Sequence, residues 1–431
     1  MVTARSRGRS EFSPFAFPPE PFPLWEIRVT FPRPVAPFPS SIDAAVDALV
    51  PGRLAGKRIA VTAGSRGIRG IADILARVVA RLKAVGAQPV VVAAMGSHGG
   101  ATAEGQQRLL ARLGITEAAV GAPILAEMEV VELGRTAGGL VAYCDRRAAE
   151  CDGILVVNRI KPHTGFAEPI GSGLLKMLAV GLGKAPGAAQ IHRQGPAGMA
   201  QAIEEIAAVF LASGKVLGGL AIIENAYDET ADVVAVPPGE MATWERELFR
   251  RAKALMPRLP VDEADVLIVN EMGKNFSGTG MDVNIIGRWR LPGMPDPSVP
   301  RFSRIVVLRL SPESEGNAQG VGLADVVTRR LVDAIDPVTT YTNTITSTFL
   351  ERGFIPITMP TDREAIGAAL ASLALPDPGQ ARIVRIRNTL HLDRLWVSEA
   401  VLPALAGRPD VTVGAPVPLQ FAADGTLADL A

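Results

Sequence analysis

Short apolar segments alternate with amphipathic ones along most of this chain, and this alternation constrains the fold more than any other feature. Segments 57–62 (KRIAVT) and 89–95 (PVVVAAM) are largely apolar along their length, which predicts strands buried on both faces. Between them, residues 71–85 carry apolar side chains at helical spacing and end at Gly86, a common helix terminator. Buried strands that alternate with helices predict an α/β fold in which largely parallel sheets are covered by helices.

The same pattern continues towards the C-terminus and predicts two α/β domains, with the active site in the cleft between them. We place the boundary at the turn after Met256 and Pro257, so that one domain covers residues 1–257 and the other 258–431. A Pro-rich leader through Pro39 is expected to run extended over the surface, and the Pro-rich stretch 291–300 is expected to form a covering loop. We expect further strands at 153–157, 220–224, 265–269 and 304–310, and further helices at 103–113 (capped by Thr102), 199–212, 241–255, 322–334 and 363–373.

The composition argues against several classes of partner. With 44 basic and 44 acidic residues the formal net charge is zero, so we expect no binding of nucleic acid or of an anionic membrane surface. The sequence has no run of about 18 apolar residues, and residues 1–25 lack the apolar centre of a secretion signal, so we expect a cytoplasmic protein. The cysteines, Cys144 and Cys151, match no common metal or redox spacing and are expected to be plain thiols.

Three of the four histidines lie in glycine-bearing loops that follow an expected strand or helix. His98 (MGSHGGAT) and His163 (NRIKPHTGF) each follow a strand, and α/β proteins gather their ligands at the carboxyl ends of parallel strands. Each of them alone, like His192 (AAQIHRQGPAG), could serve only to bond its own loop. As a pair, His98 and His163 are suited to act as acid and base near neutral pH, because imidazole titrates there. Any of the three could instead bind a divalent transition metal.

Lys176 is surrounded by apolar and glycine residues in the stretch GSGLLKMLAVGLG. A buried ammonium is costly unless it is paired, deprotonated or covalently used, which makes this lysine a candidate for chemistry. The alternative is a lysine at the end of a short helix that extends its ammonium group to solvent.

The turn at 63–70 (AGSRGIRG) carries groups suited to an anionic ligand. It holds Ser65, Arg66 and Arg69, and its backbone could cradle a phosphate, although it contains neither a GxGxxG fingerprint nor the ending of a P-loop. An arginine in this turn would hold either a carboxylate or a phosphate, because the guanidinium group bonds both through paired hydrogen bonds. The turn is therefore a candidate site for a substrate carboxylate or a cofactor phosphate.

A second glycine-rich loop follows the expected strand at 265–269. It places Lys274, Asn275 and Ser277 where ligands collect in α/β folds, so these residues are candidates for binding the substrate. The remaining histidine, His391 (NTLHLDRL), alternates with apolar residues on an expected strand and is predicted to be structural.

At these residues the chain resembles the nickel-dependent lactate racemase family. The similarity extends from about residue 22 to near the C-terminus and is strongest over GSRGI, GSHGGAT, KPHTGF and the stretch from GSGLLK to IHRQG. The family histidine that is followed by Thr and Glu corresponds to His98 with Thr102 and Glu104, and the one that follows a proline corresponds to His163. The resemblance implies that His98 and His163 are the catalytic acid and base.

The family uses a nickel-pincer nucleotide, pyridinium-3-thioamide-5-thiocarboxylic acid mononucleotide, made from a nicotinic acid precursor. The resemblance implies that Lys176 carries this cofactor through a thioamide and that His192 ligates the nickel. The expected cofactor-binding residues are then Ser65, Arg66, Gly171, Gly173 and Lys176, the expected metal ligand is His192, and the expected substrate-binding residues are Arg69, Lys274, Asn275 and Ser277.

By this resemblance the chain is an isomerase, a racemase or epimerase of a 2-hydroxy acid that works by hydride transfer to and from the pincer. Its expected partners are the hydroxy acid substrate and the proteins that make the cofactor and insert nickel. Family members typically carry an Asp-x-Thr-Arg-Pro turn after the first strand, whereas residues 64–67 are Gly-Ser-Arg-Gly, and extra residues lie between His163 and Lys176. Both departures affect substrate recognition, so we expect a divergent branch that acts on a 2-hydroxy acid other than lactate.

Two other functions are compatible with the same residues. A divalent-metal hydrolase or lyase would use the histidines without the pincer and leave Lys176 unmodified. A non-catalytic binder of a carboxylated or phosphorylated metabolite would keep the fold without the chemistry.

Overall fold

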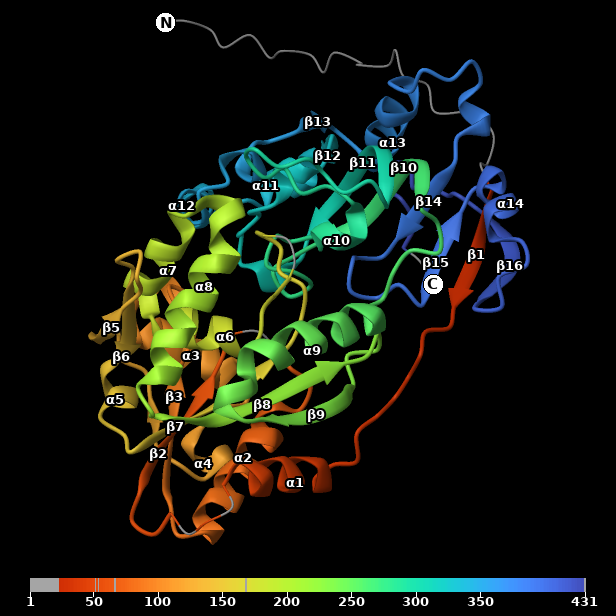
Figure 1. Cartoon of the computed structure of the whole chain (residues 1–431). Helices are drawn as coiled ribbons and strands as arrows, with labels where there is room; N and C mark the ends of the chain where they lie inside the picture. The colour runs from red at the N-terminus through yellow and green to blue at the C-terminus, as the bar shows by residue number, and fades with distance from the viewer. Residues whose placement is uncertain (1–22, 51, 53, 66, 167–168, 430–431) are drawn as a thin grey trace, which may run out of the picture.

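The computed structural model describes residues 23–429 apart from 51, 53, 66, 167 and 168, and it contains two large sheets with helices packed on their faces (Figure 1). We call the part built on the first sheet the N-terminal lobe (residues 40–255). The part built on the second sheet is the C-terminal lobe (residues 23–29 and 263–429). The predicted α/β class with largely parallel sheets is confirmed.

The sheet of the N-terminal lobe has six strands in the order β4-β3-β2-β7-β8-β9. All neighbours are parallel except β8 and β9, which are antiparallel. Its central strands are buried on both faces, as their apolar sequences predicted. The strands are β2 (Arg58–Ala63), β3 (Gln88–Ala93), β4 (Ile124–Leu125), β7 (Gly153–Arg159), β8 (Val216–Glu224) and β9 (Thr230–Val236), and a separate antiparallel hairpin joins β5 (Val130–Arg135) to β6 (Val141–Asp145).

Helices cover both faces of this sheet because alternate strand residues point into two separate apolar cores. One core receives side chains from α1 (Ser40–Leu49), α2 (Ile71–Ala84), α3 (Ala103–Arg112) and α4 (Glu117–Val120). The other receives them from α5 (Arg146–Ala149), α6 (Leu174–Lys176), the π-helix η2 (Met177–Leu182), α7 (Lys184–His192), α8 (Gly195–Ala212) and α9 (Met241–Leu255). Thr102 caps α3 as predicted, since its hydroxyl accepts the backbone N–H of Gly105 at 3.1 Å.

The sheet of the C-terminal lobe has eight strands in the order β13-β12-β11-β10-β14-β15-β1-β16. The strands from β13 to β14 are parallel, and the rest pair antiparallel. They are β1 (Pro23–Val29), β10 (Glu263–Met272), β11 (Arg301–Leu310), β12 (Val326–Thr328), β13 (Ile357–Met359), β14 (Ile383–Ile386), β15 (Arg394–Val397) and β16 (Val411–Pro418). The helices are α10 (Val283–Ile286), α11 (Arg329–Asp333), α12 (Pro337–Ser347), α13 (Asp362–Ala371) and α14 (Leu402–Leu405).

Strand β1 corrects two expectations about the start of the chain. Residues 23–29 neither run extended over the surface nor belong to the N-terminal lobe, because β1 lies between β15 and β16 of the second sheet (Figure 1). The segment reads PLWEIRV, and its Leu24 and Ile27 are at most 1% exposed. A boundary after Pro257 therefore separates α9 from β10 but assigns β1 to the wrong lobe.

Two other local predictions need correction. Residues 322–334 do not form one helix: a 3-10 turn ends at Leu323, Val326 and Val327 lie in β12, and only 329–333 are α-helical, because β-branched residues fit the buried sheet. His391 lies in the loop between β14 and β15 rather than on a strand, with its ring bonded to the side chain of Asn388.

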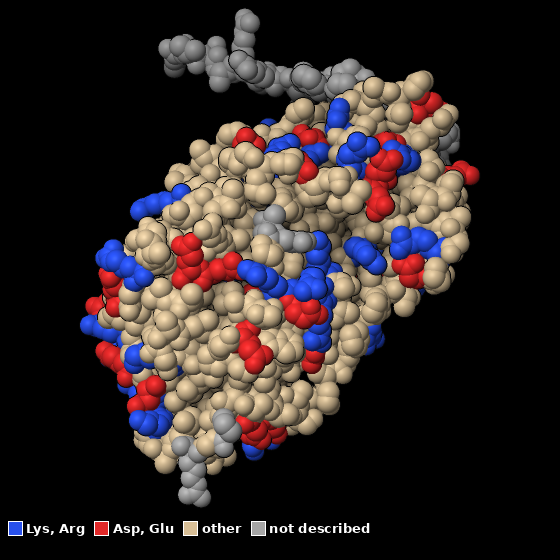
Figure 2. Space-filling model, viewed as in Figure 1, with Lys and Arg blue, Asp and Glu red and all other residues tan. Residues whose placement is uncertain are grey.

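Two observations bear on the expected absence of membrane and nucleic-acid partners. Among the described helices, none combines the length and the apolarity that a membrane span requires. On the face shown in Figure 2, acidic and basic side chains of the described residues are intermingled.

Candidate active site

The loops that carry Ser65, His98 and His163 lie side by side in the N-terminal lobe. Strand β2 pairs in parallel with β3 on one side and β7 on the other, so the loops that follow these strands share one edge of the sheet. The Ser65 hydroxyl forms a hydrogen bond with Nδ1 of His98. Arg66, expected to bind the cofactor, is outside the described residues.

The buried side chain of Gln106 fixes the backbone of the loop that carries His98. The side-chain amide of Gln106 in α3 donates to the carbonyl oxygens of Gly96 (2.9 Å) and His98 (3.3 Å). Its oxygen accepts a hydrogen bond from Lys184 Nζ at 3.0 Å, and Lys184 also donates to the Ala93 carbonyl at the end of β3. Lys184 is paired with Asp145 at 3.0 Å, and these two side chains are 0% and 1% exposed. The loop that presents His98 is therefore fixed to β3, β6 and α7.

The His163 ring is held by its own loop. Its Nδ1 accepts the backbone N–H of Gly165 at 2.9 Å, and the Phe166 ring stacks on it with centroids 4.3 Å apart. Because Nδ1 accepts a hydrogen bond, the neutral ring carries its proton on Nε2. In its neutral form His163 is thus arranged as a hydrogen-bond donor through Nε2.

Lys176 ends the short helix α6, whose start is fixed by two side chains from elsewhere in the fold. The Asn158 amide donates to the Gly173 carbonyl at 2.8 Å, and Glu245 of α9 accepts the backbone N–H of Leu174 at 2.9 Å. Lys176 itself is half-buried, with Nζ 3.4 Å from the Ser172 hydroxyl. Ser172 pairs through its backbone with Lys161, which places Lys176 beside the His163 loop.

Glu245 makes the stability of this lobe depend on pH. Burial raises the pKa of its carboxyl from 4.5 to about 7, against the opposing effect of the backbone N–H groups of Leu174 and Leu175. A carboxyl whose pKa is higher in the folded state than in the unfolded state contributes its full stabilisation of the fold below pH 4.5. This stabilisation is lost as the pH rises through 7.

We therefore expect Glu245→Gln to become more stable relative to the wild type as the pH rises from 4 to 8, by up to about 3 kcal/mol. Urea unfolding at several pH values measures this difference. Glu247→Gln, on the same helix with a side chain 47% exposed, is the matched control and should show no such trend. A difference for Glu245→Gln that does not change with pH would contradict the assignment.

His192 is the last residue of α7 and has an unsatisfied nitrogen. Its Nδ1 is buried, and within the described part of the chain it has no hydrogen-bond partner. Burial, and secondly the positive charge of Lys176, lower the pKa of this imidazole below 6.5. His192 is therefore neutral at pH 7 and has a lone pair available for a metal ion.

The expected cofactor glycines are explained by contacts within the protein. A Cβ on Gly171 would lie 2.2 Å from the Lys161 carbonyl oxygen, and one on Gly173 would collide with the Glu245 carboxylate. Both glycines therefore allow segments of the N-terminal lobe to approach closely. Whether their backbones also meet a ligand stays a prediction.

The expected substrate-binding residues make hydrogen bonds within the protein. The backbone N–H of Arg69 donates to Glu224 at 2.9 Å, and its guanidinium lies 3.5 Å from the Tyr227 carbonyl. In the C-terminal lobe, Lys274 Nζ donates to Gly278, Gln319 and Asn343, Asn275 accepts from Ser311, and Ser277 bonds Thr279. These hydrogen bonds hold the loop at 273–282 together, and a substrate role for its residues stays a prediction.

The sequence did not identify the residues that support the site segments through hydrogen bonds and an ion pair. They are Gln106, Asp145, Lys184, Glu245 and Asn158. Lys184 has the same apolar surroundings that singled out Lys176 and was detectable by the same argument. The two cysteines are buried and form no disulfide, and burial raises the pKa of Cys144 to about 12, which agrees with an unreactive thiol.

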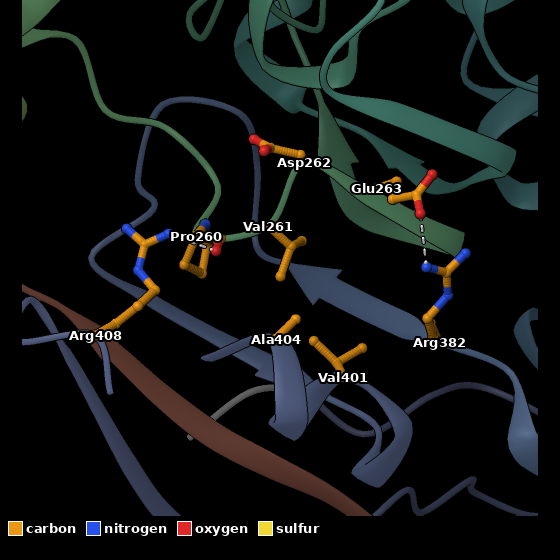
Figure 3. Close-up of a pocket in the computed structure, with 8 residues that line it drawn as sticks. All are labelled: Pro260, Val261, Asp262, Glu263, Arg382, Val401, Ala404 and Arg408. Atoms are coloured by element: carbon orange, nitrogen blue, oxygen red, sulfur yellow. Dashed lines mark hydrogen bonds and ion pairs between the residues drawn. The ribbon is translucent and has the colours of Figure 1, made fainter. Parts of the chain in front are cut away.

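A separate pocket lies in the C-terminal lobe (Figure 3). It is found at the start of β10, the end of that strand opposite to the loop at 273–282. Both of its arginines are already paired: Arg382 bonds Glu263 and Asp265, and Arg408 bonds Asp410. We assign this pocket no role in the chemistry.

The comparison with protein families shows which proteins this chain is related to. Residues 57–193 match the family model of the lactate racemase N-terminal domain, and this range contains the serine, the three histidines and both lysines described above. The chain is a relative of the lactate racemases. No curated protein matches it. Among solved structures, the lactate racemase apoprotein from Thermoanaerobacterium thermosaccharolyticum is similar, with a TM-score of 0.49 and 10% identity over 85% of this chain and 99% of that chain. The family model thus confirms the predicted resemblance to the lactate racemases over residues 57–193.

Proposed function

We propose that this lactate racemase relative is a racemase or epimerase of a 2-hydroxy acid that uses a nickel-pincer nucleotide bound to Lys176. One observation carries the proposal: a half-buried lysine whose charge lowers the pKa of a buried histidine precedes that histidine in the chain, and the histidine has an unsatisfied nitrogen. Both residues lie in the region that matches the lactate racemase N-terminal domain. That relationship indicates activity of the racemase or epimerase type.

The residues present fit this cofactor. A lysine that forms a thioamide must be reached by the cofactor, and the two lysines of this segment differ in this respect. Lys184 is fully buried, whereas Lys176 is half-buried and can be reached from outside the core. Lys176 is therefore the better attachment point.

The metal would have a single protein ligand. No group of three or more His, Cys, Asp and Glu side chains suited to a metal ion occurs among the described residues. His192 offers one buried nitrogen, so the other ligands would come from the pincer itself. When bound, the pincer nucleotide supplies a carbon that takes up a hydride and returns it, which avoids a carbanion beside the substrate carboxylate.

The protein residues then handle the hydroxyl proton of the substrate. We assign proton removal from one enantiomer to His98, because its Nδ1 can donate to the Ser65 hydroxyl and leave Nε2 as the basic atom. His163 would act in its imidazolium form: it would give the Nε2 proton to the oxygen of the planar 2-keto acid and be left as the neutral ring. In the reverse direction the two roles exchange.

The experiment that tests this proposal is mass spectrometry of the intact protein after expression with the proteins that make the cofactor and insert nickel. We expect an added mass on Lys176, located by peptide mapping, together with bound nickel and racemisation of a 2-hydroxy acid measured by chiral chromatography. Lys176→Arg should lose the added mass and the activity, and Lys83→Arg, an exposed lysine on α2, should keep both.

Other outcomes would support other functions. Unmodified protein whose activity is restored by zinc or magnesium alone indicates the metal hydrolase or lyase. Tight binding of a carboxylated or phosphorylated metabolite, without turnover over a panel of 2-hydroxy acids, indicates a binding protein. Either result overturns the proposal.

A further inference from the structure

The loop that carries His163 is covered by two side chains of the C-terminal lobe, although it belongs to the N-terminal lobe. Arg352 donates through Nη2 to the carbonyl of Thr164 at 2.7 Å, across a separation of 188 residues. The Phe349 ring lies 3.1 Å from the position that a Cβ on Gly165 would occupy. These contacts involve the two residues that follow His163.

Arg352 is an unusual group for this position. Its residue is 1% exposed, and burial lowers the pKa of its guanidinium to about 10. Its hydrogen bonds go to backbone carbonyls: those to Trp289 measure 2.9 Å from Nε and 2.7 Å from Nη2, and the third goes to Thr164. The guanidinium also lies over the Phe349 ring, 4.8 Å from its centre. A buried cation bonded in this way is costly to move, so its contact with the His163 loop is well defined.

The contact reaches the ring of His163 through one residue. Gly165, which Phe349 covers, donates the backbone N–H that Nδ1 of His163 accepts. This hydrogen bond sets which ring nitrogen carries the proton. A shift of Thr164 or Gly165 would therefore change both the direction and the protonation of the imidazole.

We infer that Arg352 and Phe349 are positioning residues for His163, so that the acid–base histidine is fixed only while the two lobes are packed together. The expected effect of these two residues on racemisation rests on the proposed function, whereas their expected effect on the loop at 163–166 does not. Two other ion pairs join the lobes through residues outside 163–166, namely Lys161 with Asp282 at 3.2 Å and Arg112 with Glu315 at 2.7 Å. They provide a control for lobe contact alone.

Hydrogen–deuterium exchange on the full chain tests the inference without any activity. In Arg352→Met we expect the Gly165 amide to exchange at least tenfold faster, with exchange in α8 unchanged. Arg352→Lys, which keeps one donor, should show a smaller increase, and Phe349→Leu should also expose this amide. Arg112→Gln breaks an interlobe ion pair whose side chains are 58% and 63% exposed, and should leave Gly165 unchanged.

Equal exchange of Gly165 in the wild type and in Arg352→Met overturns the inference, and so does faster exchange in Arg112→Gln of the same size. If Arg352→Met does not fold, Arg352→Lys and Phe349→Leu decide by the same measurement. If the loaded enzyme racemises a substrate, these variants should lower kcat at least tenfold with KM within threefold, and change the pH profile of kcat. Faster Gly165 exchange in an inactive protein would refute the racemase and leave the positioning role intact.

Discussion

Replacing Lys184 by methionine should lower the free energy of unfolding by about 3–5 kcal/mol, because it leaves a buried carboxylate without its partner. Lys184 and Asp145 are paired at 3.0 Å with side chains 0% and 1% exposed. The substitution also removes the donor to the Gln106 oxygen and to the Ala93 carbonyl. Chemical denaturation monitored by circular dichroism measures the loss.

The loss should grow with pH. Burial already raises the pKa of Asp145 above 3.8 even with Lys184 present, and removal of the ammonium raises it further. The raised folded pKa means that the variant keeps its stability at low pH, where the carboxyl is protonated in both states. That stability is lost as the pH rises through the pKa that Asp145 has in the folded variant. The deficit of Lys184→Met should therefore be larger at pH 8 than at pH 5.

Two further variants separate the buried charge from the lost packing. Lys184→Met combined with Asp145→Asn removes both charges, keeps an acceptor for the Ala148 N–H and should recover part of the loss. Lys57→Met breaks an exposed lysine–aspartate pair, with Asp152, whose side chains are 57% and 42% exposed, and should change stability little. If Lys184→Met lowered the free energy of unfolding as little as Lys57→Met, the Lys184–Asp145 pair would not hold the His98 loop.

The sequence pattern was sufficient for the parts of the fold that depend on local periodicity. The helix at 71–85 and the strands at 57–62 and 89–95 were predicted almost to their ends, because a buried parallel strand is apolar on both faces and an amphipathic helix repeats every 3.6 residues. Parallel pairing also placed the loops of Ser65, His98 and His163 at one edge of the sheet.

Features that depend on contacts between distant residues could not be predicted in this way. β1 joins the second sheet by pairing with β15 and β16 near the other end of the chain, and nothing in PLWEIRV specifies that partner. Glu245 caps the helix of Lys176 from 71 residues away, and Arg352 reaches Thr164 across 188 residues. Side-chain periodicity shows that a residue is buried but not what it contacts.

In the loaded enzyme, His98→Gln and His163→Gln should each lower kcat by about 10²–10⁴-fold, the usual contribution of a general acid or base. Glutamine keeps much of the polarity and size of histidine but cannot take up a proton near neutral pH. His391→Gln replaces an exposed histidine of the C-terminal lobe and is the matched control, with activity close to the wild type. Initial rates from each enantiomer, measured by chiral chromatography, check all three variants.

The direction of the reaction makes this test more specific. For two enantiomers the equilibrium constant is one, so kcat/KM must fall by the same factor in both directions whichever histidine is lost. The separate roles appear instead in the pH profiles, because His98 begins one direction as base and His163 begins the other. Ser65→Ala removes the group bonded to His98 Nδ1 and should shift the His98-dependent limb of the profile while leaving the other limb in place. A profile in which both limbs move together would show that the two imidazoles act as one coupled group rather than as an acid and a base with separate positions.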